Sequence, residues 1–480
     1  MPNLALKRGV NTRHTLARSG LNQRVGESSQ LLRWLGVMVF LLLAAPKLRI
    51  MIGPAPLYVI DGLIAYLLLS SNRLPTVKWA SLNSPLPNLV TFYLMLIWLG
   101  ELRGLVTYGA VLESVYIVVE FSLAVSLFFT VPSLVNNTEA CSVILKAIVV
   151  GLFCASAVTI LYSFAPTRSL VMNTIFSYDF LVPNSESLAR RTLYYGGLTE
   201  AMRGQSLIGT STITTGFLGT MWAFTFLAIK WPGIDGKWRI LLHITTITTP
   251  IAMLMTYGRA AWLTVIVIGA MSMILGFAKS RRNTAILVIG LTIVVFRLGW
   301  KSELFMVDRV FEKTQLAIEN PYEEKSFGNR LLSYTQPFSH LMDHPVWLVA
   351  GAGRVGQKLS SRGHVAAELY EAAGLSKHSG FGMAYYCYGM LAAITHTLIM
   401  FNGLRFILKR LQGPVPEGSP LYKITWQAFL MAWVGLLFWW LPGHAMVGEA
   451  RGVILFFFFY GFMMSCDRML ADQQNEVVLE

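Results

Sequence analysis

The sequence predicts an all-α, polytopic integral membrane protein with about twelve transmembrane helices and one large extracytoplasmic loop. Three observations lead to this fold class. The 480-residue chain is 54% hydrophobic and only 13% charged, whereas soluble domains carry about 25% charged residues. Apolar runs long enough to span a bilayer, roughly 20 residues each, recur along almost the whole chain. The mean hydropathy of +0.55 likewise excludes a soluble globular protein.

The chain begins with a basic tail at residues 1–30 and ends with a second tail at 467–480. No convincing cleavage site follows the first apolar run, so we expect that run to be retained as a helix. Nine helices are predicted within 31–299 and three within 379–466. Their ranges are 31–46, 54–70, 86–101, 112–133, 143–164, 206–229, 238–256, 260–278, 283–299, 379–402, 423–441 and 450–466.

Basic residues predict the orientation of these helices. With the N-terminus in the cytoplasm, the short inner loops are rich in arginine and lysine, which is the positive-inside pattern. They are Arg73, Lys78, Lys230, Lys237, Arg239, Lys279, Arg281, Arg282, Arg405, Lys409, Arg410 and Lys423. The net charge of +14 therefore indicates contact with anionic membrane lipid, and no nucleic acid partner is expected. An even number of helices also places the C-terminus in the cytoplasm.

Two long segments then lie outside the cytoplasm, an outer loop at 165–205 and a large periplasmic loop at 300–378. Structureless loops of the second length are uncommon in compact proteins, so we expect surface helices within it. The stretch 364–375 has helix-forming residues in amphipathic spacing. We find no internal repeat.

Arg259 is the most informative polar residue. It lies at a tight outer turn between two apolar helices, in Thr256-Tyr257-Gly258-Arg259-Ala260. The positive-inside rule disfavours an arginine at this position, and no acidic residue is near it in sequence. One interpretation is an arginine that extends to the outer headgroups; the interpretation we favour is anion binding, because a guanidinium offers a planar fork of donors to phosphate oxygens.

The outer loop at 165–205 supplies further cations, Arg190, Arg191 and Arg203. Arg203 stands just before a helix rich in glycine, serine and threonine, residue types that let helices approach closely or line a polar cavity. Each arginine alone is as compatible with a solvated loop as with a ligand contact. Together with Arg259 they predict an anionic, membrane-bound substrate.

His378 lies where the large loop re-enters the membrane. An imidazole there could accept a proton from a sugar hydroxyl near the headgroup plane, although an interfacial histidine without a chemical role is the competing interpretation. No metal site is predicted, because the first outer loop, around Lys47 and Arg49, has no carboxylate. Asp61 and Glu120 are isolated within helices and are interpreted as structural residues.

These residues resemble the superfamily of O-antigen ligases and O-antigen or exopolysaccharide polymerases. The resemblance rests on an arginine turn, a tryptophan-containing helix, a long loop and a histidine that opens the next helix. Its loop motifs are Asn329-Arg330-Leu331, Asp343-His344-Pro345 and Gly351-Ala352-Gly353, followed by His378, Tyr386, Gly389 and Met390. The family often has serine before the arginine, glycine after it and asparagine after the histidine, where this chain has Gly258, Ala260 and Ser379. His364 is the alternative key histidine.

The resemblance implies an enzyme of the bacterial inner membrane, without a metal or other cofactor. It would transfer a glycan from undecaprenyl diphosphate to an acceptor sugar with inversion at the anomeric carbon. Arg259, Arg191 and Arg203 would hold the diphosphate, His378 would orient or deprotonate the acceptor hydroxyl, and Arg330 would assist binding or loop packing. A chain-length regulator and a flippase are the candidate protein partners.

Several alternatives remain open from the sequence. A polymerase would transfer to an acceptor glycan, the growing repeat-unit chain, and a ligase to the lipid A core; the departures from the ligase motif favour a polymerase. A transporter of lipid-linked glycans is the alternative of another class, although the repeated halves typical of transporters are not evident. A scaffold without chemistry is the third.

Overall fold

The computed structural model describes most of the membrane region and part of the large loop. The described residues are 28–52, 55–71, 84–176, 178, 204–256, 258–275, 315–316, 318–320, 325–354, 356, 379–413, 420–441, 443 and 445–479. Most of them are helical, and one antiparallel hairpin is the only sheet in these ranges. The predicted helix at 283–299 and the amphipathic stretch 364–375 lie outside the described residues.

Helices dominate the chain from its first described residue to its last. After a helix at Ser28–Ala44, the elements are β1 (Arg49–Ile52), β2 (Ala55–Tyr58), α2 (Val59–Ser71), α3 (Leu86–Tyr108), α4 (Val111–Leu134), α5 (Thr138–Ser163), α6 (Ala165–Thr174), α8 (Ser211–Lys230), α9 (Lys237–Leu254), α10 (Arg259–Ile274), α13 (Lys325–Asp343), η3 (Pro345–Leu348), α16 (Gly380–Tyr388), α17 (Met390–Gln412), α18 (Pro420–Trp440), α19 (Ala445–Gly448) and α20 (Ala450–Leu479).

Seven helices in the described ranges are long and apolar enough to cross a bilayer: α3, α4, α5, α8, α17, α18 and α20. Three shorter apolar helices, Ser28–Ala44, α2 and α10, accompany them. A helix satisfies its own backbone hydrogen bonds, which is why it can pass through a hydrocarbon layer that offers none. The chain is therefore an all-α, multi-pass membrane protein, as its composition predicts.

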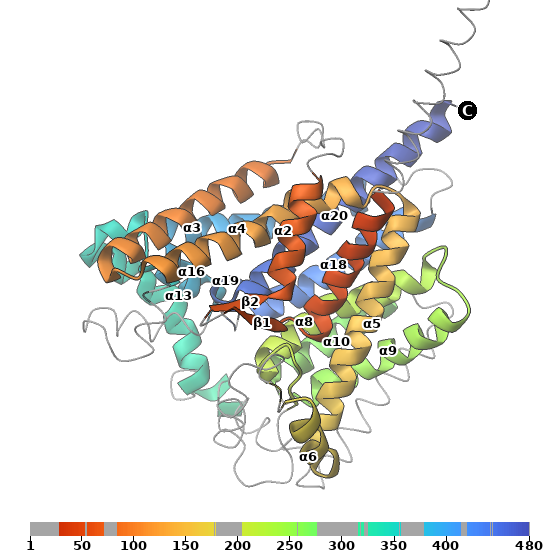
Figure 1. Cartoon of the computed structure of the whole chain (residues 1–480), viewed down its shortest axis with the longest axis horizontal. Coiled ribbons are helices and arrows are strands. Elements are labelled where there is room, and N and C mark those ends of the chain that lie inside the picture. The colour runs from red at the N-terminus through yellow and green to blue at the C-terminus, as the bar shows by residue number, and fades with distance from the viewer. Residues whose placement is uncertain are drawn as a thin grey trace, which may run out of the picture.

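The helix α20 forms the centre of the bundle. Within its apolar stretch 94% of the residues are buried, compared with 39% in α3. It packs along α4, while α8 packs along α18 and is almost as deeply buried. Figure 1 shows α20 passing among the other helices toward the C-terminus. The weakly buried α3 instead presents a large apolar surface, with Leu102 and Val106 exposed, as expected of a helix that faces lipid.

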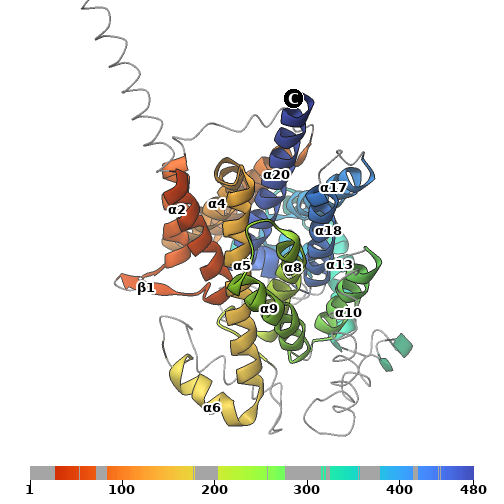
Figure 2. The same cartoon turned by 90° about the vertical axis from the view of Figure 1, so that its right-hand side faces the viewer.

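Helices α10 and α18 run antiparallel, so the start of α10 and the end of α18 lie at the same end of the bundle. The Gln427 side-chain amide, near the start of α18, donates a hydrogen bond to the Leu275 carbonyl at the end of α10, at 2.9 Å. The two helices pack on each other, so Arg259 and Trp440 lie at the opposite, common end. We call it the Arg259 end. In both views it is the end away from the C-terminus, and α6 projects from it (Figures 1 and 2).

Some predicted boundaries were wrong. The helix expected at 54–70 begins at Val59, because Ala55–Tyr58 pairs as a strand with Arg49–Ile52. The helix α3 continues to Tyr108, beyond the predicted residue 101. The predicted tail at 467–480 is helical through Leu479, and its Asp467 pairs with Arg410 at 2.7 Å.

The helix predicted at 379–402 is two helices. It breaks at Gly389, which has a φ of 93° that side-chain-bearing residues rarely adopt. A Cβ at this position would also lie 2.9 Å from the Ala350 nitrogen and 2.9 Å from the Trp347 carbonyl oxygen. The break therefore gives the large loop room to approach the helix backbone.

Candidate functional site

The turn that carries Arg259 is held by Trp262. The Trp262 indole donates a hydrogen bond to the Leu254 carbonyl at 3.3 Å, and its backbone amide bonds the Gly258 carbonyl at 3.1 Å. One side chain thus joins the end of α9 to the first turn of α10. Arg259 is the first residue of α10 and is half-buried, so its guanidinium projects from a fixed turn at the bundle end.

The start of α8 lies against the same turn. The Gly204 amide donates to the Met255 carbonyl at 2.8 Å, and the Thr215 and Thr256 hydroxyls lie 2.8 Å apart. A Cβ on Gly204 would lie 2.7 Å from the Ser163 hydroxyl oxygen, so only glycine permits this approach. Gly204 directly follows Arg203. Arg203 and Arg191 themselves lie outside the described residues.

Lys47 is a further cation at this end. Its ammonium nitrogen lies 3.2 Å from the position that a Cβ on Gly209 would occupy. Gly209 belongs to the short turn that precedes α8, where its amide bonds the Ser206 carbonyl at 3.2 Å. From the sequence, the first outer loop was used only as an argument against a metal site, because it has no carboxylate. Its lysine extends to the hydroxyl-rich start of α8, a contact that sequence spacing does not reveal.

Arg330 and Tyr334 lie one helical turn apart on α13, which packs on α16. The Tyr334 phenol donates a hydrogen bond to the Leu441 carbonyl at 2.7 Å, directly after α18. Its ring lies 6.1 Å from that of Phe381 and 6.5 Å from that of Trp440, between centroids. These contacts fix α13, and with it the half-buried Arg330, to the Arg259 end.

Ser379 caps the start of α16 beside Tyr334. Its hydroxyl accepts the Gly382 amide at 2.9 Å, which satisfies one of the free amides of the helix start. Burial raises the pKa of Tyr334 to about 12, while a hydrogen bond with Ser379 and the charge of Arg330 lower it in part. The phenol therefore stays protonated at neutral pH. Ser379 directly follows His378, which, like His364, lies outside the described residues.

The structure thus brings some predicted site residues together and does not describe others. Arg259 and Arg330 both lie at the Arg259 end, where the residues that directly follow Arg203 and His378 also lie. Gly380 packs so closely on Trp440 that a Cβ would lie 2.2 Å from the indole Cδ1. Hydroxyl groups and aromatic rings join the segments that carry these cations, Thr215 and Thr256 at the Arg259 turn and Tyr334, Phe381 and Trp440 beside α13.

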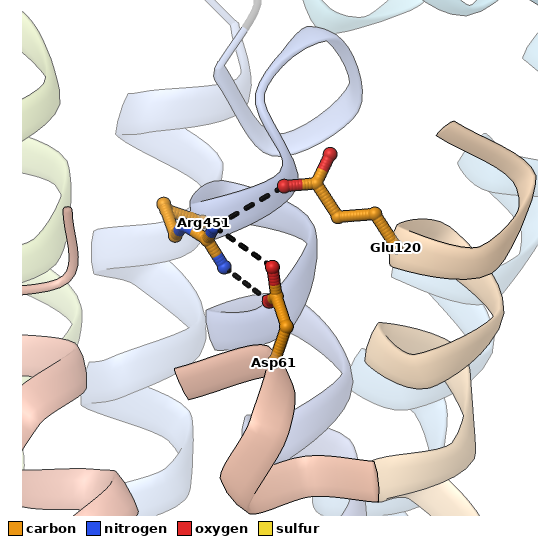
Figure 3. A network of polar contacts seen from close by, with 3 residues as sticks. All are labelled: Asp61, Glu120 and Arg451. Atoms are coloured by element: carbon orange, nitrogen blue, oxygen red, sulfur yellow. Dashed lines mark hydrogen bonds and ion pairs between the residues drawn. The ribbon is translucent and has the colours of Figure 1, made fainter. Parts of the chain in front are cut away.

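A second charged cluster lies inside the bundle, between β2, α2, α4 and α20. The Arg451 guanidinium pairs with both Asp61 oxygens, at 2.5 and 3.1 Å, and with a Glu120 oxygen at 3.2 Å (Figure 3). It also lies 4.1 Å from the centre of the Tyr58 ring. Asp61 and Glu120 were expected to be structural, and Arg451 is the partner that sequence reasoning missed. Among the described residues no group of three or more His, Cys, Asp or Glu could hold a metal ion.

Comparison with known proteins finds no protein-family model and no curated protein that matches this chain. The site must therefore be judged on its own geometry. Like Lys47 and Arg451, Tyr334 could not be identified from the sequence, because its hydrogen bond to Leu441 joins residues more than a hundred positions apart and leaves no local signal. Its place one turn after Arg330 was the one available clue.

Proposed function

We propose that the chain is a membrane glycosyltransferase that uses an undecaprenyl-diphosphate-linked glycan as donor. One observation supports this proposal most: Arg259, Arg330 and Lys47 lie on segments that meet at one end of an apolar helix bundle, where hydroxyl and aromatic side chains join those segments. A diphosphate at a membrane surface requires such donors, and guanidinium groups bind its oxygens in bidentate geometry. The identity of the carrier lipid and the type of reaction are inferred from the resemblance to O-antigen ligases and polymerases.

The proposed topology has twelve membrane helices: the seven long and three shorter apolar helices given above, together with α9 and the predicted helix at 283–299. The large loop at 300–378 and the Arg259 end face the periplasm, and both termini face the cytoplasm of a bacterial inner membrane. The diphosphate of the carrier lipid would then lie at the Arg259 end while its polyprenyl chain stays in the outer leaflet.

In the proposed reaction, an acceptor hydroxyl oxygen attacks the anomeric carbon of the donor glycan. His378 takes the hydroxyl proton, and the bond from the anomeric carbon to the phosphate oxygen breaks with its electron pair leaving on undecaprenyl diphosphate. A single displacement inverts the anomeric configuration. Arg259, with Arg191 and Arg203, binds the leaving diphosphate, and Arg330 binds beside them. Fixed donors in a site of low dielectric stabilise such developing charge strongly.

The acceptor decides the biological role. We propose a polymerase that extends O-antigen or exopolysaccharide repeat units; a ligase would join finished polymer to the lipid A core. A strain without the protein distinguishes the two: loss of a polymerase leaves single repeat units on the final acceptor, whereas loss of a ligase leaves long polymer on the carrier lipid.

The direct test uses purified protein in liposomes with lipid-linked repeat units, and gel analysis of the products. We expect elongated or transferred glycan with the wild-type protein and none with Arg259→Ala. Binding of the carrier lipid without transfer, or its movement across the bilayer, would instead indicate a transporter. Unchanged polysaccharide output from both Arg259→Ala and His378→Ala at normal protein levels would indicate a scaffold.

A further inference from the structure

A segment of the large loop enters the helix bundle. Residues 345–354, which we call the wedge, comprise η3 and the Gly351-Ala352-Gly353 motif. The Ala352 amide donates a hydrogen bond to the Tyr386 carbonyl in α16 at 2.8 Å, and Trp347 is only 1% exposed. Tyr386 lies in the last turn of α16, where carbonyls have no partner within the helix, and the wedge supplies a donor to this one. The wedge thus lies between α3 and the break that separates α16 from α17.

Close backbone contact holds the wedge in the space between α3 and the break that separates α16 from α17, which we call the notch. A Cβ on Gly351 would lie 2.4 Å from the Tyr386 carbonyl oxygen, and one on Gly104 would lie 3.0 Å from the Ala352 carbonyl oxygen. Gly100 is equally restricted, since its Cβ would lie 2.7 Å from the Cys387 carbonyl oxygen. Three backbones therefore meet where any side chain would separate them, and small residues are what permit such packing of helices in membranes.

Two charged side chains of α3 bind the backbone of the wedge. Glu101 is fully buried, and its carboxylate accepts the Arg354 amide at 2.6 Å. The Arg103 guanidinium donates to the carbonyl oxygens of Ala350 and Gly351 and lies 4.9 Å from the centre of the Trp347 ring. Charged groups at membrane depth are costly. That two of them bind the backbone of a loop indicates that the fold requires this loop to stay in place.

The wedge is also connected to α13. His340, in the last turn of α13, has its Nδ1 2.7 Å from the Tyr385 hydroxyl, and its ring lies 4.9 Å from that of Trp347. Helix α13 carries Arg330 and Tyr334. Together with the contacts of Tyr334, the wedge therefore anchors the large loop to the membrane helices between Arg330 and the start of α16.

We propose that Glu101 and Arg103 are positioning residues that lock the wedge in its notch and thereby hold α13 and Arg330 in place at the Arg259 end. The lock itself follows from the contacts above; its effect on glycan transfer rests on the proposed function. Glu101 and Arg103 touch the loop backbone and would act on the substrate only through it.

The chain contains a native reporter for the lock. Cys387 is fully buried, and its backbone lies directly beneath Gly351 and Gly100. Cys141 and Cys466 are also buried free thiols, their sulfurs 3.8 Å apart, while Cys154 is partly exposed. Opening of the wedge would expose Cys387 alone, whereas general unfolding would expose all three buried thiols.

The experiment measures N-ethylmaleimide modification of each cysteine by mass spectrometry in membranes that contain the full chain. In the wild type we expect protection of Cys387, Cys141 and Cys466. Glu101→Leu and Arg103→Met should each accelerate modification of Cys387 by about tenfold or more, since local opening is governed by the contacts that close it. Cys141 and Cys466 should stay protected. Glu101→Gln keeps an acceptor oxygen and should resemble the wild type.

Arg405→Met, an exposed arginine on α17, is the matched control and should change nothing. Continued protection of Cys387 in Glu101→Leu, or joint exposure of all three buried thiols, would overturn the proposal. Should Glu101→Leu yield no folded protein, Arg103→Met decides by the same criteria, because Arg103 is only half-buried.

Transfer assays then test the consequence for the reaction. Positioning predicts that Arg103→Met lowers kcat more than it raises KM for the lipid-linked donor, because a misplaced Arg330 would lose contacts to the charge that develops on the leaving diphosphate. Glu101→Gln should retain the wild-type kcat. Selective exposure of Cys387 with no transfer by any form of the protein, wild type included, would refute the proposed function and leave the lock intact.

Discussion

The Arg451 cluster and the Arg259 end place arginines in opposite settings. Arg451 is 4% exposed and bonds two carboxylates of its own chain. Arg259 and Arg330 are half-buried, at the first turn of α10 and on the loop helix α13. A buried arginine paired with carboxylates joins helices, whereas a half-buried arginine on a fixed turn can reach a ligand at the surface. The comparison distinguishes an arginine that stabilises the fold, Arg451, from arginines that are candidates for substrate binding, Arg259 and Arg330.

The two settings also predict different mutational behaviour. Removing one partner of a buried ion pair leaves an uncompensated charge in a medium of low dielectric, which lowers the free energy of unfolding. A half-buried arginine keeps part of its hydration, so its removal should cost the folded state less. Substitutions in the Arg451 cluster should therefore lower stability, and substitutions at the Arg259 end should lower transfer by a folded protein.

The largest effect is expected for Arg451→Met. It strands Asp61 and Glu120 inside the bundle, which should destabilise the protein by about 3–5 kcal/mol. Thermal unfolding in detergent and the protein level in membranes measure this effect. The triple variant Arg451→Met, Asp61→Asn, Glu120→Gln removes the charges together and should recover much of the loss. A stable Arg451→Met single variant would contradict the structural role of the cluster.

Arg259→Ala should lower kcat/KM for transfer by about 100-fold or more, the usual cost of losing one donor to developing negative charge. Its thermal stability should match the wild type. Arg259→Lys keeps the charge but loses the bidentate fork, and we expect an intermediate rate. Arg405→Met again serves as control. If Arg259→Ala lost thermal stability as well as transfer activity, the proposed difference between the two regions would be wrong.

Tyr334→Phe should cost about 1 kcal/mol of stability by removing the hydrogen bond to Leu441. Because the pKa of Tyr334 is raised from 10.0 to about 12, the folded protein holds the phenolic proton more tightly than the unfolded chain. The difference from wild type should be constant between about pH 7 and 9 and shrink above about pH 10, where only the wild type must keep this buried phenol protonated. Urea unfolding at several pH values measures it, and a difference that grows above pH 10 would refute the assignment.

Thr256→Val should have the smallest effect. The Thr256 hydroxyl lies 2.8 Å from that of Thr215 and bonds the Met253 carbonyl at 2.6 Å, just before Arg259. Loss of these bonds should cost only about 0.5 kcal/mol, because valine fills the same space and the Thr215 hydroxyl keeps its bond to the Ser211 carbonyl. A double-mutant cycle with Thr215→Val isolates the pair. Fully additive losses would show that the two hydroxyls do not join α8 to the Arg259 turn.

Much of the fold could be predicted from the sequence. Runs of apolar residues identify membrane helices because each helix must satisfy its backbone within the hydrocarbon layer. The break at Gly389 could not be predicted, since its cause is the approach of Trp347 and Ala350 from a distant loop. The strand Ala55–Tyr58 was missed because the apolar run that contains it suits a helix equally well.

The candidate site was only partly predictable. Arg259 stood out because an arginine between apolar helices contradicts the positive-inside pattern, a signal carried by a few neighbouring residues. Lys47, Tyr334 and Glu101 act through partners more than a hundred residues away. No local pattern encodes such pairs, and each becomes recognisable only when the helices are placed side by side.

The central claim is that cationic side chains at the Arg259 end bind the pyrophosphate of a carrier lipid during glycan transfer. The most direct measurement is transfer by purified protein from lipid-linked repeat units in the presence of EDTA, for the wild type and Arg259→Ala in parallel. The account predicts full wild-type transfer in EDTA and its loss in Arg259→Ala. Loss of wild-type transfer in EDTA, with recovery on adding a divalent cation, would contradict it.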